Sequence, residues 1–317
     1  MAMPAARLPK AIRLELEELD HRIKTLLPEE YRDSYETMQP VPMRAAGLKY
    51  AADGRVAWNE IWGSFCDLAM AGGPPHKGAL LEPASPDLVR ANPTQYDAVV
   101  AEICRGITMV TDLPADPAPV PGWIRVDCFS TEMAGWLLRA IVMENVAVRA
   151  QGRALELPAA PAFRLEKEIK NVITVIAKTS HYWMGHMPRA QKAAVADLFA
   201  RLDPSVPLLQ PDRADNGERS AAEAGLAAAI ADRVFADAGL RASHHTYSGW
   251  LGVECPSVLA AVWMMRALVV SNVLARREGG VLFVPVNAGA DPAGDRVVDA
   301  VGRVFRLAVA RGVVASR

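Results

Sequence analysis

The pattern of apolar and polar residues along the chain predicts one local unit that occurs twice. Residues 123–128 alternate and contain β-branched side chains, which is typical of a strand. Apolar residues then recur at helical spacing from residue 131 to near Asn145, and two short strands around Gly152 follow as a hairpin. Residues 250–285 show the same order. The unit is therefore strand, helix and hairpin.

The two copies also agree residue by residue. Residues 122–158 align without a gap with residues 249–285, and 16 of the 37 aligned positions are identical. Shared composition does not produce such agreement, so we interpret it as an internal duplication. The identical pairs with chemically informative side chains are Trp123/Trp250, Cys128/Cys255, Ser130/Ser257, Trp136/Trp263, Arg139/Arg266, Asn145/Asn272 and Arg149/Arg276.

The ends of the repeated helices carry signals of their own. Ser130 or Thr131 is available as the N-cap of the first helix, and Pro256 suits the first turn of the second. Asn145 and Asn272 fit the C-cap position, because asparagine tolerates a left-handed backbone.

Further helices are predicted on either side of the two copies. Their expected ranges are 56–70, 94–105, 165–184, 220–238 and 293–311, with a linker at 203–219. Together these elements predict an α/β (α+β) fold in two pseudo-symmetric halves, each a small sheet covered by helices. The expected boundaries are an N-terminal helical extension at 1–54, a first half at 55–160 and a second half at 161–317.

Composition and charge narrow the function classes. The 317 residues are 51% hydrophobic, which excludes disorder as the main state, and 35 basic against 36 acidic residues give no electrostatic footprint for nucleic acid or an anionic membrane. The start of the chain resembles no secretory signal, and we expect a cytoplasmic protein with reduced thiols. Aromatic residues in the repeats favour homo-oligomerisation. No nucleotide-binding loop or GxSxG elbow is present, and the sequence identifies no cofactor.

The repeated cysteines, Cys128 and Cys255, are the candidate catalytic residues. Each follows a predicted strand and precedes a helix, where the helix N-terminus lowers a thiol pKa. Such thiols act as nucleophiles, as an acid–base pair or as soft metal ligands. The alternative is that each is a small buried hydrophobic residue. Cys66 and Cys104 have no counterpart in the repeat and are expected to be structural.

Several polar side chains are candidates for holding an anionic group. Asn171, Lys178 and His181 share one face of the predicted helix at 165–184, and Arg139 and Arg266 are charges kept in both repeats. A solvated helix face and local salt bridges are the alternatives. The glycine-rich stretch 72–78 contains His76 and Lys77, and it is a candidate to bind an anion through its backbone amides and the lysine side chain. The alternative is a helix end followed by a proline turn, which explains most of the same stretch.

The histidines give a weaker signal for a metal. His181 and His186 are five residues apart, which is unsuitable for two ligands on one α-helical face, and Gly185 is expected to break the helix between them. His244 and His245 are adjacent, so in a strand they point to opposite faces. Zinc or iron held by Cys128, Cys255 and one or two histidines is a further alternative.

These observations predict a small-molecule enzyme. Its ligand is expected between the two halves, near Cys128 and Cys255, with the polar helix face orienting an anionic group. The first alternative is a non-catalytic binding or scaffold protein, in which the repeat only builds a symmetric core. The second is a metalloprotein that uses cysteine and histidine.

Overall fold

The computed structural model describes residues 8–33, 35, 47–60, 79–202, 206–212 and 220–315. By its contacts the chain divides into two compact units, each built around one sheet. The β1–β4 unit comprises Pro40–Ala193 and Asp215–Gly217, and the β5–β8 unit comprises Met1–Gln39, Ala194–Ala214 and Glu218–Arg317. This division places residues 161–193 with the first sheet.

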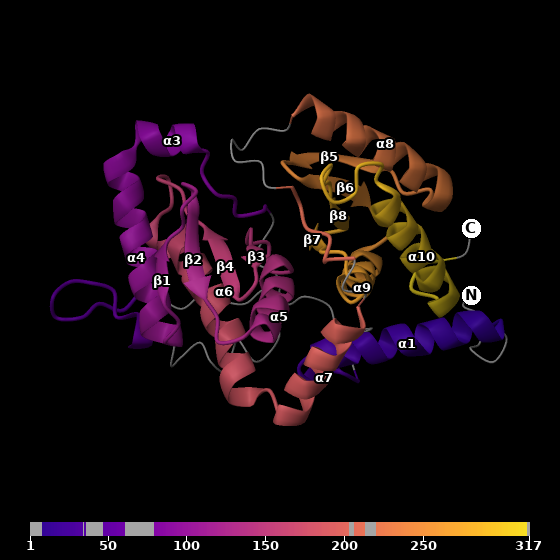
Figure 1. Cartoon of the computed structure of the whole chain (residues 1–317), viewed down its shortest axis with the longest axis horizontal. Coiled ribbons are helices and arrows are strands. Elements are labelled where there is room, and N and C mark those ends of the chain that lie inside the picture. Colours follow the sequence, from indigo (N-terminus) through magenta and orange to yellow (C-terminus); the bar gives the residue numbers. More distant parts are fainter. Residues whose placement is uncertain are drawn as a thin grey trace. The chain divides into compact units, whose positions relative to one another are not determined.

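The β1–β4 unit is a four-stranded antiparallel sheet packed with helices (Figure 1). Its elements are α3 (Pro86–Ala91), α4 (Pro93–Thr111), β1 (Ala115–Pro117), β2 (Trp123–Asp127), α5 (Thr131–Val142), β3 (Arg149–Gln151), β4 (Ala154–Pro158) and α6 (Lys170–His181). One π-helical turn (Leu165–Ile169) precedes α6 and another (Tyr182–His186) follows it. The helix α7 (Arg189–Arg201) begins in this unit and ends in the other.

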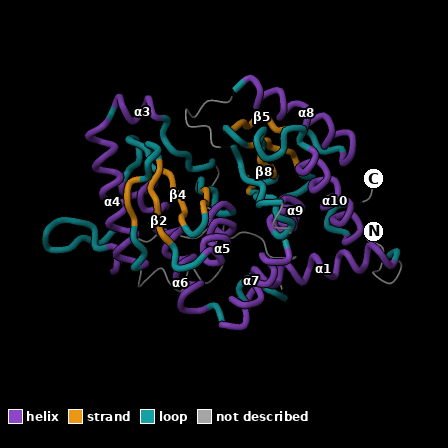
Figure 2. Tube along the Cα trace, in the orientation of Figure 1, coloured by secondary structure: helices purple, strands orange, loops and turns teal. Residues whose placement is uncertain are grey.

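The β5–β8 unit has a second sheet of the same kind, whose strands are drawn in orange in Figure 2. Its elements are α1 (Lys10–Leu26), a 3₁₀ turn (Glu29–Tyr31), α8 (Ala221–Ala238), β5 (Ala242–Tyr247), β6 (Trp250–Glu254), α9 (Val258–Val269), β7 (Arg276–Glu278), β8 (Val281–Pro285) and α10 (Asp295–Arg311). The helix α1, expected as an N-terminal extension, packs against α9 and α10.

The two sheets have the same topology, and their central and hairpin strands pair in the same register, whereas β5 has a register shift between Ala242 and Thr246 that β1 lacks. Their strand orders are β1-β2-β4-β3 and β5-β6-β8-β7. Trp123 pairs with Pro158 in the first sheet, and the matched Trp250 pairs with Pro285 in the second. The predicted mixed α/β class, with two small sheets covered by helices, is confirmed. The likeness agrees with a duplication, which itself remains a hypothesis.

The sheets are held to their helices by an apolar face. Ile124 and Val126 of β2 and Leu155 and Leu157 of β4 are fully buried, while Arg125 between them is exposed. This alternation follows from the two-residue period of a strand. Removing such side chains from water stabilises the sheet by roughly 25 cal/mol per Å² of apolar surface, and α5 contacts it at β3 and β4.

The helix ends follow the predicted signals in part. The Ser130 hydroxyl accepts a hydrogen bond from the Met133 amide at 3.1 Å, as expected of an N-cap. In the second copy Ser257 is the cap, so the prediction that Pro256 opens the helix is wrong. Asn145 and Asn272 adopt φ of 58° and 64°, in the left-handed region. They lie three residues beyond the helices instead of at the C-caps, because each helix ends earlier than its apolar pattern.

The flanking helices are largely where the pattern predicts them. The helices expected at 220–238 and 293–311 are α8 and α10, whereas α4 continues six residues beyond the expected end at 105. Most of the helix expected at 56–70, and with it Cys66, lies outside the described residues. In the part of the chain that the structure describes, no helix is long and apolar enough to cross a membrane.

Candidate functional site

The two repeated cysteines occupy the predicted junctions between strand and helix. The Cys128 amide donates to the Arg153 carbonyl at 3.0 Å, and the Cys255 amide donates to the Gly280 carbonyl at 2.9 Å. Both residues therefore extend the central strand by one hydrogen bond before the chain turns into α5 or α9.

The environment of these thiols differs from the expectation of a lowered pKa. Cys128 is 2% exposed, and its burial, with Asp127 nearby, raises the pKa of its thiol to about 12. Burial also raises the pKa of the Cys255 thiol to about 12. The expected lowering is wrong because desolvation of the thiolate outweighs the attraction of a helix N-terminus. A catalytic role for either thiol remains a prediction.

The repeated arginines make contacts within their own units. The Arg139 guanidinium donates to the Gly135 carbonyl at 2.9 Å, one turn earlier in α5, and burial lowers its pKa to about 10. Arg266 donates to the carbonyl of Tyr35 at 2.5 Å and lies 5.9 Å from the centre of that ring. Its pKa also falls to about 10, through burial and the charge of Arg277. Binding of an anion by Arg139 or Arg266 remains a prediction.

A second pair of repeated arginines stacks on the repeated tryptophans. The guanidinium carbon of Arg149 lies 4.2 Å from the centre of the Trp123 ring, and that of Arg276 lies 5.3 Å from the centre of Trp250. Arg149 is also paired with Glu156 on the neighbouring strand. Cation–π contact and packing account for these repeated residues without a ligand.

The predicted anion-binding face of α6 is partly neutralised. Lys178 forms an ion pair with Glu144 at 2.6 Å, with the two side chains 10% and 13% exposed. A lysine in such a pair offers little net charge to an anion. Asn171 is half-buried on the same helix. His76 and Lys77 lie outside the described residues, so their predicted role stays a prediction.

The structure brings His181 and His186 together. Their Nε2 atoms are 2.8 Å apart and their ring centres 4.7 Å apart. The expectation that Gly185 separates them is wrong, because the chain continues through Gly185 as the π-helical turn Tyr182–His186. The Met187 amide donates to the Tyr182 carbonyl at 2.7 Å, the i to i+5 bond of a π turn. Residues five apart therefore face each other here, as they do not in an α-helix.

Buried aromatic rings hold this histidine pair in place. The His186 ring lies parallel to Tyr182 within 13°, with ring centres 6.5 Å apart, and Tyr182 stacks in turn on Trp136 of α5 at 5.7 Å. The Tyr182 hydroxyl donates to the Gln191 side chain at 3.3 Å. Tyr182 and Trp136 are 7% and 6% exposed, so the rings beneath the histidine pair are buried, while His186 itself is exposed.

The geometry of the pair suits a shared proton or a shared metal ion. Burial and the neighbouring His186 lower the pKa of the His181 imidazole, which favours its neutral, metal-binding form. Two imidazole nitrogens bound to one ion at about 2.0–2.1 Å are roughly 2.8–3.5 Å apart, depending on the angle at the metal. The observed separation of 2.8 Å matches a right angle at the ion, and a tetrahedral angle requires the two nitrogens to move apart by about 0.5 Å.

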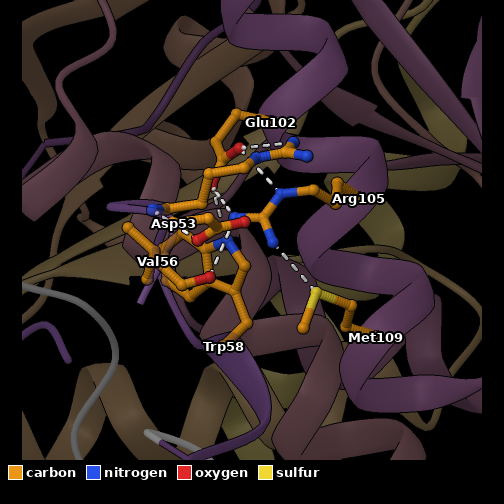
Figure 3. Close-up of polar contacts among 7 residues, drawn as sticks. Asp53, Val56, Trp58, Glu102, Arg105 and Met109 are labelled. Atoms are coloured by element: carbon orange, nitrogen blue, oxygen red, sulfur yellow. Dashed lines mark hydrogen bonds and ion pairs between the residues drawn. The ribbon is translucent and has the colours of Figure 1, made fainter. Parts of the chain in front are cut away.

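A further polar cluster, which the sequence pattern did not reveal, joins the segment 47–60 to α4 (Figure 3). Glu102 accepts hydrogen bonds from the Trp58 indole at 2.8 Å and from Arg105 at 2.5 Å. Arg105 also donates to the Val56 carbonyl at 2.9 Å and to the Met109 sulfur at 3.0 Å. Each of these groups has a partner within the cluster, which indicates a structural role.

Comparison with models of protein families, with curated proteins and with solved structures finds no match to this chain.

Proposed function

We propose that this chain is a transition-metal-binding protein and that His181 and His186 hold the ion. The observation that carries the proposal is the separation of 2.8 Å between the two Nε2 atoms, on one half-buried and one exposed side chain. Neutral imidazole is the commonest metal ligand among side chains and suits zinc, copper and nickel. The aromatic stack beneath His186 supports this, because ligands that are already oriented lose less freedom on binding.

Two imidazoles fill only part of the coordination sphere of such an ion. Among the residues that the structure describes, no group of three or more His, Cys, Asp and Glu side chains is placed to hold a metal. We propose that the remaining positions take water or the donor atoms of a small molecule. The anionic ligand predicted from sequence would then bind the ion directly instead of Lys178, whose charge is paired with Glu144.

A thiol-dependent enzyme is the second candidate. The observation in its favour is the identical position of Cys128 and Cys255 at the junction of strand and helix in both units. Their burial weighs against it, since a thiol with a pKa near 12 is almost wholly protonated at neutral pH.

Calorimetric titration of the untagged protein with Ni²⁺ tests the metal proposal. We expect one ion per chain, with His181→Ala and His186→Ala each weakening binding by at least about tenfold. The matched control is the double variant His244→Ala with His245→Ala, which also removes two histidines. These residues are exposed and adjacent on β5, and the His245 ring lies 3.5 Å from the Glu278 carboxylate. The proposal fails if His181→Ala binds nickel as tightly as the natural protein does.

A further inference from the structure

A polar cluster joins the two edge strands of the β5–β8 sheet. The Nδ1 atom of His245 on β5 lies 3.5 Å from one carboxylate oxygen of Glu278 on β7, and Nη1 of Arg276 lies 2.6 Å from the other oxygen. We propose that His245 is a phosphoryl-acceptor site, with Nε2 as the nucleophile and Glu278 as the residue that positions the ring. This site is separate from the pair His181 and His186 and needs no metal.

The cluster is buried at one end and accessible at the other. The side chains of Arg276 and Glu278 are 0% and 8% exposed, whereas that of His245 is 69% exposed. The Arg276 guanidinium packs on aromatic rings, with its carbon 4.4 Å from the centre of Tyr247 and 4.0 Å from the centre of Phe283. Glu278 is therefore held in place by the sheet, while the imidazole that it faces is open to a small phosphoryl donor.

The backbone of β5 gives His245 its position. The pairing of β5 with β6 shifts register between Ala242 and Thr246, and the His245 amide donates to the Ser243 hydroxyl at 3.2 Å. Such a bulge bends a strand and re-aims its side chains.

The first sheet lacks the features that build this cluster. In the described part of that sheet, β1 has three residues and pairs with β2 without a register shift. By the alignment of the two copies, Gln151 stands where the second unit has Glu278. The repeated fold therefore forms without the cluster, which is consistent with a role beyond folding.

The charges of the cluster suit attack on phosphorus. A carboxylate beside Nδ1 favours the tautomer with the proton on that nitrogen, which leaves the Nε2 lone pair available. A carboxylate alone would repel an anionic phosphoryl group, but the guanidinium of Arg276 at 2.6 Å offsets its charge.

The donor class that we infer is an acyl phosphate. Nε2 of His245 forms the bond to phosphorus, and the bond from phosphorus to the acyl oxygen breaks, so that a carboxylate leaves with the electron pair. Nδ1 keeps its proton. The positive charge that the ring gains is stabilised by the carboxylate of Glu278.

Incubation with radiolabelled acetyl phosphate tests the site. We expect one phosphate per chain on His245, labile to acid and stable to alkali as a phosphoramidate is, and no label in His245→Ala. His244→Ala is the matched control, because His244 is the adjacent exposed histidine on β5 and its loss should leave the labelling unchanged. Glu278→Gln keeps the shape of the side chain without its charge and should slow the labelling at least about tenfold.

Reaction with diethyl pyrocarbonate distinguishes positioning of one ring from a general change in the strand. In Glu278→Gln, His244 should react as it does in the natural protein, and a changed rate at His244 would make the effect structural and contradict the inference. The inference is also wrong if the phosphate lies on another residue, if no residue is labelled, or if Glu278→Gln is labelled at the natural rate.

Discussion

Replacement of Glu102 by alanine should lower the free energy of unfolding of the β1–β4 unit. The effect should be larger than that of replacing Asp97, the other acidic residue of α4. Glu102 accepts from the Trp58 indole at 2.8 Å and from Arg105 at 2.5 Å, with the Glu102 and Arg105 side chains each 19% exposed. The change leaves the indole N–H of Trp58, a residue only 2% exposed, without its acceptor. It also removes the carboxylate that pairs with Arg105.

The magnitude follows from these two losses. A hydrogen bond to a charged group contributes about 1.5–3 kcal/mol, and a buried donor left unsatisfied costs about 1–3 kcal/mol. We therefore expect Glu102→Ala to lower the free energy of unfolding of this unit by about 3–5 kcal/mol. Glu102→Gln keeps an oxygen for the indole and should cost only about 1–2 kcal/mol.

Hydrogen–deuterium exchange across a urea series is the appropriate assay, because a chain with two units need not unfold in one step. Protection should fall in α4 and in residues 47–60, and remain unchanged in α8 and α10. Asp97→Ala removes an exposed acid from the same helix and should cost at most about 1 kcal/mol. A loss below about 1 kcal/mol for Glu102→Ala would refute the structural role assigned to this cluster.

Three further predictions concern packing, ionisation and ligand binding. Gly106→Ala places a Cβ 2.3 Å from the Ile173 side chain and should lower the free energy of unfolding in urea by about 1–3 kcal/mol. Gly225→Ala in α8 meets no atom within 4 Å and should raise it by up to about 1 kcal/mol. Equal effects of the two substitutions would contradict the packing around Gly106. The Cys128 pKa is raised from 9.0 to about 12, so its contribution to stability is complete below pH 9 and lost as pH rises towards 12. Cys128→Ala should therefore show a shallower alkaline loss of stability, and an unchanged slope between about pH 8 and pH 11 would argue against a buried thiol. Nickel affinity should fall as pH decreases, because a protonated imidazole binds no metal, and the loss that comes from His181 should begin below the ordinary histidine pKa of 6.5 because burial and His186 lower the pKa of that ring. Binding that does not change with pH would exclude the histidine pair.

The repeated pattern was sufficient to predict the central strand, the following helix and the hairpin of each unit, because alternation and helical spacing are local properties. The edge strand β1 was not predicted. Its three residues include Asp116 and Pro117 and have no apolar alternation; only the pairing with β2 makes them a strand. Edge positions tolerate such residues, which is why their sequence signal is weak.

The candidate site shows the limit of the same reasoning. Helical spacing of 3.6 residues separates His181 from His186, and only the i to i+5 bonding of a π turn brings them together. The sequence signal that could have indicated this pairing is the aromatic pair Tyr182 and Trp183 between the two histidines. Both rings pack on Trp136 and hold the π turn in place. The pairing of Lys178 with Glu144 depends on a residue beyond the end of another helix, which no local pattern reveals.

Side-chain nitrogen-15 NMR during addition of substoichiometric Ni²⁺ tests the central claim most directly, because it reads each histidine separately. The sequence contains six histidines, so the spectrum can be assigned with single substitutions. The metal-binding proposal predicts that the imidazole signals of His181 and His186 broaden first and together. Earlier broadening at His21, His244 or His245, with the signals of the pair unchanged, would contradict it.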